Sequence, residues 1–238
     1  MVNFKIKVAN KVFEINAFYE FTKKYCLDFL CEENPDYFIT MSEQDLINEV
    51  NETSSGKVYV SEEISALYRK IADILLEYDI IVFHGSSFMV NNQGFIVTAR
   101  SGVGKSTHVK LLEEFIGDSF KYINDDKPLL EVKDNVIIHS NPWNGKERRG
   151  NNISTPLKAI LFLARSETPT YKKIDNKEEI NIKLLSQTYL PREKSKREKA
   201  LKIMDALFNK TNFYEINVNQ NIESAKMTYE RIIKNETK

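Results

Sequence analysis

The sequence is poor in cysteine, and its cysteines are not accompanied by other metal-binding side chains. Cys26 and Cys31 lie close together near the N-terminus, with neither a second cysteine pair nor a histidine cluster nearby. A zinc site is therefore not expected. Reduced thiols without a disulfide framework are typical of cytoplasmic proteins, so we expect a cytoplasmic location.

Net charge and long apolar runs are also missing. The 34 basic and 34 acidic residues give a formal net charge of zero, so no global field favours nucleic acid or an acidic membrane as a partner. No apolar run reaches membrane-spanning length, and the N-terminus lacks the apolar region of a signal peptide. The content of 42% hydrophobic and 29% charged residues is that of an ordinary globular protein.

The 238 residues contain no internal repeat, no low-complexity tract and no evident linker. We therefore predict a single domain over residues 1–238, made of an N-terminal part (1–78) and a core (79–238). Apolar alternation indicates a hairpin over residues 1–16, and a helical apolar stripe indicates a long helix over 61–78.

Later segments complete the expected architecture. Short apolar runs, several of them joined by hairpin turns, predict an α/β fold with a mixed β-sheet and flanking helices. We expect the charged segment 167–179 to be a loop and the basic segment 192–208 to be a helix. Such a basic helix is usually a solvated surface, but it can instead dock an acidic partner or contact phosphates.

One stretch, residues 95–112, organises the chain. An apolar, β-branched run (95–98) precedes Ser-Gly-Val-Gly-Lys-Ser-Thr, and a helical pattern follows. Strand, glycine loop and helix in this order are the context of a phosphate-binding loop (P-loop). Gly102 and Gly104 allow the backbone to approach an anion closely, and successive N–H groups at the helix start bind it. Lys105 can reach the β- and γ-phosphates, while the Ser106 hydroxyl can bind Mg²⁺.

The loop departs from the usual pattern at one position, because Ala99 stands where the first glycine is expected. Since the rest of the pattern is intact, we interpret the loop as a variant. The expected nucleotide-binding residues are Ser101, Gly102, Val103, Gly104, Lys105, Ser106 and Thr107.

Asp125 and Asp126 follow a short apolar run after the helix, and they form the second candidate motif. In P-loop enzymes an acid at a strand end commonly holds Mg²⁺, and another can accept a hydroxyl proton. Alone, two adjacent aspartates are more often a solvated turn. After a phosphate loop, we favour the functional interpretation.

Two further segments carry candidate residues. His84 ends a buried run before the loop, where it can orient an acid or an acceptor, or simply bind backbone. In the loop 141–150, Glu147 can join the Mg²⁺ ligands. The same loop supplies cations that can neutralise charge on a transferred phosphoryl group, namely Lys146, Arg148 and Arg149. The alternative is a solvated loop anchored by Trp143.

The order of these motifs resembles the catalytic domain of HPr kinase/phosphorylase and its smaller relatives, which share a core with ATP-dependent phosphoenolpyruvate carboxykinases. The segment 152–160, Asn-Ile-Ser-Thr-Pro-Leu-Lys-Ala-Ile, strengthens the resemblance to the small kinases, several of which accompany peptide-modification gene clusters. The motifs span about residues 80–165, and residues 213–233 are also similar.

The resemblance implies a kinase with Mg-ATP bound at the loop. It implies Asp126 as the base toward a hydroxyl, Asp125 and Glu147 beside the metal, and His84 positioning the acceptor. Independently of the resemblance, the charged loop supplies Arg148 as the expected catalytic cation. The bifunctional enzyme carries a longer glycine-rich signature where this chain has residues 151–154. Phosphorolysis, hexamer assembly and HPr as the substrate are therefore not implied.

Two functions remain open at this point. The favoured one is an ATP-dependent phosphotransferase acting on the hydroxyl of a peptide, a protein or a small molecule. The other is a nucleotide-responsive binding protein without acceptor chemistry. The sequence also leaves open whether GTP or pyrophosphate replaces ATP and whether copies of the chain assemble.

Overall fold

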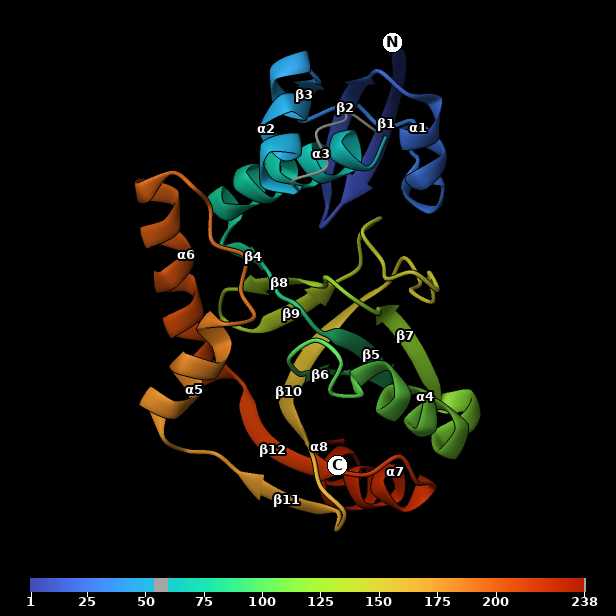
Figure 1. Ribbon diagram of the computed structural model, residues 1–238, viewed down its shortest axis with the longest axis vertical. Helices are drawn as coiled ribbons and strands as arrows, with labels where there is room; N and C mark the ends of the chain where they lie inside the picture. Colours follow the sequence, from blue (N-terminus) through green and yellow to red (C-terminus); the bar gives the residue numbers. More distant parts are fainter. Residues whose placement is uncertain (54–59, 238) are drawn as a thin grey trace. The chain divides into compact units, whose positions relative to one another are not determined.

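A computed structural model describes residues 1–53 and 60–237 (Figure 1). Their contacts divide the chain into two compact units, Met1–Glu77 and Tyr78–Lys238. The division between N-terminal part and core falls one residue before the expected position. That the two units form a single domain stays a prediction.

The N-terminal unit is built on the expected hairpin. Strands β1 (Val2–Val8) and β2 (Lys11–Ala17) pair antiparallel, and β3 (Tyr37–Thr40) adds to β2 in parallel. The turn uses positive φ angles at Ala9 (47°) and Asn10 (61°). The helices of this unit are α1 (Glu20–Tyr25), α2 (Glu43–Thr53) and α3 (Val60–Leu75), with 3-10 turns at Leu27–Phe29 and Leu76–Tyr78.

A buried carboxylate ties two of these helices together. Glu63 of α3 is fully buried, and its oxygens accept hydrogen bonds from the main-chain N–H groups of Phe18 and Tyr19 and from the Thr22 hydroxyl. These donors lie at the beginning of α1, whose first N–H groups have no partner within the helix. The Glu63 carboxylate, which belongs to α3, therefore accepts the hydrogen bonds of donors at the start of α1.

The core unit contains the second sheet. In the described residues this sheet has nine strands, of which seven follow the order β4-β8-β9-β10-β6-β5-β7, while β12 pairs with β10 and β11 with β12. The strands are β4 (Ile80–Val82), β5 (Ser86–Val90), β6 (Gln93–Thr98), β7 (Phe120–Asn124), β8 (Leu129–Val132), β9 (Val136–His139), β10 (Ser154–Arg165), β11 (Thr170–Lys173) and β12 (Asn212–Val218). The expected α/β class with a mixed sheet and flanking helices is confirmed.

The strand directions bring several chain segments to one edge of this sheet. β6, β10 and β12 are parallel, so their C-terminal ends lie together. β5 runs antiparallel to both β6 and β7, so β7 ends at the same edge and β5 begins there. The segments that meet at this edge are therefore those following β6, β7, β10 and β12, and the one preceding β5.

Helices cover the sheet (Figure 1). α4 (Lys105–Ile116) and α7 (Ile222–Thr228) pack against each other and share a core with β5, β6, β7, β10 and β12. This core is made of buried aromatic and aliphatic side chains, with Phe88 stacked between Phe95 and Phe120. α5 (Lys177–Leu185) and α6 (Lys194–Leu207) pack against each other, and α6 also contacts β4 and β8.

The C-terminal part differs from the sequence expectation at one segment. Residues 167–179, predicted to be a loop, contain β11 and the start of α5. β11 is exposed at every position and pairs only along one side, with β12, so its residues show no buried alternation. The expected basic helix over 192–208 is present as α6, bounded by Lys194 and Leu207.

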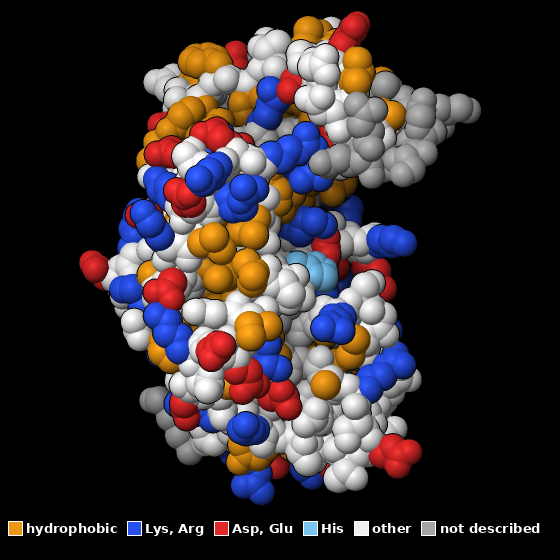
Figure 2. All heavy atoms as spheres, turned by 60° about the vertical axis from the view of Figure 1, so that its left-hand side comes forward, with side chains coloured by type: hydrophobic (Ala, Val, Ile, Leu, Met, Phe, Trp, Pro, Cys, Tyr) orange, Lys and Arg blue, Asp and Glu red, His pale blue; other side chains and the backbone are white. Residues whose placement is uncertain are grey.

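The surface agrees with the neutral composition. On the face shown in Figure 2, basic side chains are interspersed with acidic ones rather than gathered in one field. Several basic residues of α6 and α5 have acidic neighbours, as in the pairs Lys177–Asp205 (2.7 Å) and Lys196–Glu193 (3.6 Å). No described helix has the length and apolarity needed to cross a bilayer.

The buried Glu63 leads to a stability prediction for the N-terminal unit. We expect Glu63→Ala to lower the free energy of unfolding by roughly 2–4 kcal/mol, because it leaves buried donors at the start of α1 without an acceptor. Urea denaturation followed by circular dichroism measures the effect. Glu20→Ala, at an exposed acid of α1, is the matched control. Equal stability of the two variants would contradict this role of Glu63.

Candidate functional site

The glycine loop lies between β6 and α4, as the sequence predicts. Gly102 and Gly104 have φ angles of 78° and 113°, in the left-handed region that favours glycine. Gly104 directly precedes the first helical residue, and no side chain caps the helix there. The first N–H groups of α4 are thus available to an anion at the positive end of the helix.

Arg165, at the end of β10, binds carbonyl groups of this loop. Its Nε donates to the carbonyl of Val103 (2.7 Å), and its Nη2 donates to the carbonyl of Gly102 (3.0 Å). No peptide bond in the described structure is cis, so in each of these units the N–H points away from the guanidinium. The N–H of Val103 donates to the carbonyl of Arg100 (3.3 Å), so the amide that Arg165 orients and leaves available to an anion is that of Gly104.

Lys105 connects the loop to the acid pair. Its Nζ donates a hydrogen bond to the main-chain carbonyl of Asp125 (3.2 Å). Burial lowers the pKa of Lys105, while the nearby charges of Asp126 and Asp125 oppose this shift. Lys105 is thus a partly desolvated cation at the start of α4, where it can contact an anion bound at the loop.

The turn that carries the two aspartates is fixed by Asn124, a buried residue at the end of β7. The Asn124 Oδ1 accepts from the main-chain N–H groups of Asp126 (3.0 Å) and Lys127 (2.7 Å). Its own backbone exchanges two hydrogen bonds with the Ser87 hydroxyl on β5 (2.9 and 3.0 Å). This side chain-to-backbone pattern sets the direction in which the acids leave the strand.

Asp125 is held by the loop 141–152. Its Oδ1 accepts from the main-chain N–H of Gly145, and its own N–H donates to the Asn144 Oδ1 (3.1 Å). The approach requires glycine, because a Cβ at position 145 would lie 2.8 Å from the Asp125 Oδ1.

Asp126 has two cationic or potentially cationic neighbours. Its Oδ1 lies 3.5 Å from the His84 Nε2, and its Oδ2 pairs with the Lys127 ammonium. Burial acts to raise the pKa of Asp126, but the hydrogen bonds from His84 and Lys127 outweigh it and hold the pKa well below its usual range. Asp126 is therefore a firmly ionised carboxylate and a weak base.

Gln187, in the segment after α5, contacts the nitrogen of His84 that does not face Asp126. The His84 Nδ1 lies 2.9 Å from the Gln187 Oε1, which also lies 3.1 Å from the Thr98 hydroxyl. The contact holds the imidazole ring through Nδ1. Its Nε2 is thus directed toward Asp126.

The charged loop contributes Arg149 rather than Arg148 to the site. Arg149 pairs with Glu147, donates to the Tyr122 hydroxyl (3.2 Å) and lies 3.4 Å from Glu113. Burial raises the pKa of Tyr122 to about 12, despite its hydrogen bond from Arg149. The predicted catalytic cation Arg148 has a positive φ of 48° and does not line the cavity described next.

These residues surround one cavity of about 830 Å³. It brings together most of the predicted site residues, namely His84, Ser101, Gly102, Gly104, Lys105, Ser106, Thr107, Asp125, Asp126, Lys146, Glu147 and Arg149. Val103 lies outside its lining, as does Arg148. Arg165, Lys110 and Tyr122 also line the cavity, and none of them belongs to a motif that marks it in the sequence.

The donor set agrees with a magnesium ion bound together with phosphate. Among the described residues, no three His, Cys, Asp or Glu side chains are placed to hold a metal by themselves. Mg²⁺ in phosphate sites usually takes one or two carboxylates and fills its other positions with water and phosphate oxygens. Asp125, Glu147 and the Ser106 hydroxyl, which all line the cavity, fit that requirement.

Sequence comparisons do not assign the chain to a family: no family model matches it, and no curated protein matches it. Among solved structures, it is similar to the HPr(Ser) kinase/phosphatase from Coxiella burnetii, with a TM-score of 0.37 and 10% sequence identity. The match covers 65% of this chain and 98% of that one. This similarity is distant and too weak to carry over an activity.

The loop geometry leads to a prediction about Arg165. We expect Arg165→Met to weaken binding of inorganic tripolyphosphate by about tenfold, the effect of losing roughly 1.4 kcal/mol of binding free energy, because the loop amides lose their fixed direction. Arg165→Lys should recover part of the affinity, since it keeps a cation but not the paired donors. Calorimetric titration measures both constants.

Arg231→Met, at an exposed arginine outside the cavity lining, is the control for lost charge. If Arg165→Met binds tripolyphosphate as tightly as the wild type does, the role given to Arg165 is wrong.

Proposed function

We propose that this chain is an ATP-dependent phosphotransferase that phosphorylates a hydroxyl group with the help of Mg²⁺. The observation that carries the proposal is the position of Lys105, which begins α4 in the glycine loop and bonds the carbonyl of Asp125. The glycine loop and the two adjacent carboxylates thus line one cavity. A phosphoryl donor on the loop would have its transferable end near the acids.

The chain's own residues suit the charge changes of phosphoryl transfer. The γ-phosphorus–oxygen bond to the β-phosphate breaks, a bond to the acceptor oxygen forms, and ADP leaves. Lys105 and the loop amides stabilise the negative charge on the phosphates, and Lys146 and Arg149 add positive charge from the opposite loop. When bound, Mg²⁺ supplies further neutralisation, and Ser106, Asp125 and Glu147 are the residues that would hold it.

Asp126 is the proposed acceptor of the hydroxyl proton. Its low pKa makes it a weak base, which suits a loose transition state in which the acceptor proton leaves late. Lys127 pairs with one carboxylate oxygen, so the other, which faces His84, is the one proposed to receive the proton. His84 then positions the acceptor and the carboxylate, supported by Gln187.

The ion pair between Lys127 and Asp126 also favours a second function. Because Lys127 and His84 already occupy the Asp126 carboxylate, this residue can serve as a fixed structural anion. The chain would then be a nucleotide-responsive binding protein without acceptor chemistry. This alternative predicts nucleotide binding without a phosphorylated product from any acceptor.

The acceptor is proposed by class only: a hydroxyl of a peptide, a protein or a small molecule. A cytoplasmic setting is part of the proposal, in keeping with the free thiols of Cys26 and Cys31. Self-assembly stays a prediction.

The decisive assay uses ATP labelled at the γ-phosphate with serine-containing peptides and small alcohols as acceptors. We expect Lys105→Ala to reduce transfer by roughly 10²–10³-fold through lost charge stabilisation. We expect Asp126→Asn to reduce it by about 10²-fold, at the low end for a general base because this carboxylate is a weak one.

Lys121→Ala and Asp118→Asn are matched controls, since both residues are exposed and outside the cavity lining. Transfer that survives both Lys105→Ala and Asp126→Asn unaltered would contradict the assigned roles. Mg-ATP binding without transfer to any acceptor would instead favour the binding protein.

A further inference from the structure

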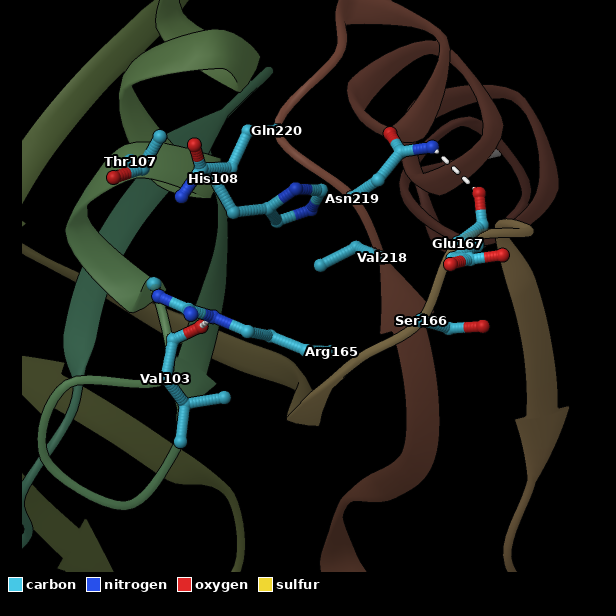
Figure 3. Close-up of a pocket in the computed structure, with 10 residues that line it drawn as sticks. Val103, Thr107, His108, Arg165, Ser166, Glu167, Val218, Asn219 and Gln220 are labelled. Carbon is cyan, nitrogen blue, oxygen red and sulfur yellow. Dashed lines mark hydrogen bonds between the residues drawn. The ribbon is translucent and has the colours of Figure 1, made fainter.

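A second pocket, of about 590 Å³, adjoins the first at the glycine loop (Figure 3). Its walls come from the segments that follow three parallel strands: Val103 and Gly104 after β6, residues 165–167 at the end of β10, and residues 218–220 at the end of β12. Ligands of α/β proteins bind in such crevices outside the C-terminal ends of parallel strands.

The two pockets share part of their lining. Gly104, Thr107 and Arg165 line both of them. A single elongated ligand can therefore lie across this junction, with one end on the loop amides and the other in the second pocket.

The chemistry of the second pocket differs from that of the first. Carbon atoms form most of its exposed wall, with Val103 and Val218 as the two apolar side chains of the lining. The ring of His108 projects from α4 toward Val218 and Asn219 (Figure 3). Polar groups are few and lie around it, with the Asn219 amide donating to the carbonyl of Glu167 (2.9 Å). Apolar walls with a small number of polar groups are typical of small-molecule sites.

His108 contributes a flat, neutral surface. The Thr228 hydroxyl donates to the carbonyl of Ser224 (3.0 Å), so its oxygen accepts from the His108 Nε2 (3.1 Å). The proton of the ring is thus on Nε2. Burial lowers the pKa of His108 to about 4, so the ring is uncharged near neutral pH.

The other ring nitrogen of His108 has no protein partner. The side chain is 1% exposed, and its Nδ1 is buried without a hydrogen bond to any described residue. With the proton on Nε2, Nδ1 is an acceptor in need of a donor. A buried acceptor of this kind usually has a partner, so one is expected from a ligand or water in the pocket beside it.

We propose that this second pocket holds the purine base and ribose of the nucleoside triphosphate whose phosphates occupy the adjoining cavity. The proposal rests on the proposed function and adds to it the site that recognises the nucleoside. A purine offers a flat ring to the apolar walls and amino groups as donors, while the ribose spans the junction at Thr107 and Arg165. The volume of about 590 Å³ lies within the range of roughly 300–1,000 Å³ found for small-molecule pockets.

The test compares two ligands that differ only in the nucleoside, Mg-ATP and inorganic tripolyphosphate with Mg²⁺. We expect the wild type to bind Mg-ATP roughly 10- to 100-fold more tightly, as base stacking contributes about this much. Val218→Phe places a ring in the pocket, and Gln220→Trp does the same from an exposed position. Both should weaken Mg-ATP binding by about tenfold and leave tripolyphosphate binding unchanged.

Thr168→Trp is the matched control, because Thr168 is exposed and lies outside the lining of both pockets. Circular dichroism checks the fold of each variant, and Gln220→Trp keeps the test informative if the buried Val218→Phe unfolds. Equal affinity for the two ligands, or Mg-ATP affinity in Gln220→Trp equal to the control, would overturn the nucleoside site while leaving the loop proposal intact. A wild type that binds neither ligand would overturn both.

Discussion

The parallel alignment of β6, β10 and β12 is the constraint on which the site depends. It brings the glycine loop, Arg165 and the segment after Val218 to one edge of the sheet. The antiparallel strand β5 then begins at this edge with His84 just before it, and β7 ends there with Asp125 and Asp126. Residues separated by more than 130 positions thus line two adjoining pockets.

The charges at this edge stabilise one another. Lys105 bonds the carbonyl of Asp125, Arg165 bonds two carbonyls of the loop, and Asp126 lies between Lys127 and His84. The N–H groups of Gly104 and of the first residues of α4 are left as the donors available to an anion, and the ionised Asp126 faces the same cavity.

The sequence predicted the parts of the site that are local. Strand, glycines and helix are adjacent in the chain, so the loop over Ser101–Thr107 could be placed from its pattern, and the structure gives both glycines positive φ angles. The hairpins and the mixed sheet were likewise predictable from short-range alternation. The phosphate contacts and catalytic roles remain predictions.

The rest depends on tertiary contacts that no local pattern encodes. Arg165 reaches the loop only because β10 is in register with β6, and Gln187 reaches His84 from beyond α5. The choice between Arg148 and Arg149 is set by an irregular loop without periodicity, in which Gly145 contacts Asp125. The exposed β11 has no buried face from which its strand could have been recognised.

The most direct test of the central claim is an amide NMR titration of the full chain with Mg-ATP. If the loop is a phosphate cradle, the N–H resonances of Gly104, Lys105 and Ser106 will shift strongly, together with those of Asp125 and Gly145 across the cavity. The amide resonance of Asp118, an exposed residue outside the lining of both pockets, provides the internal reference. Saturating Mg-ATP that leaves the loop amides unshifted would contradict the account.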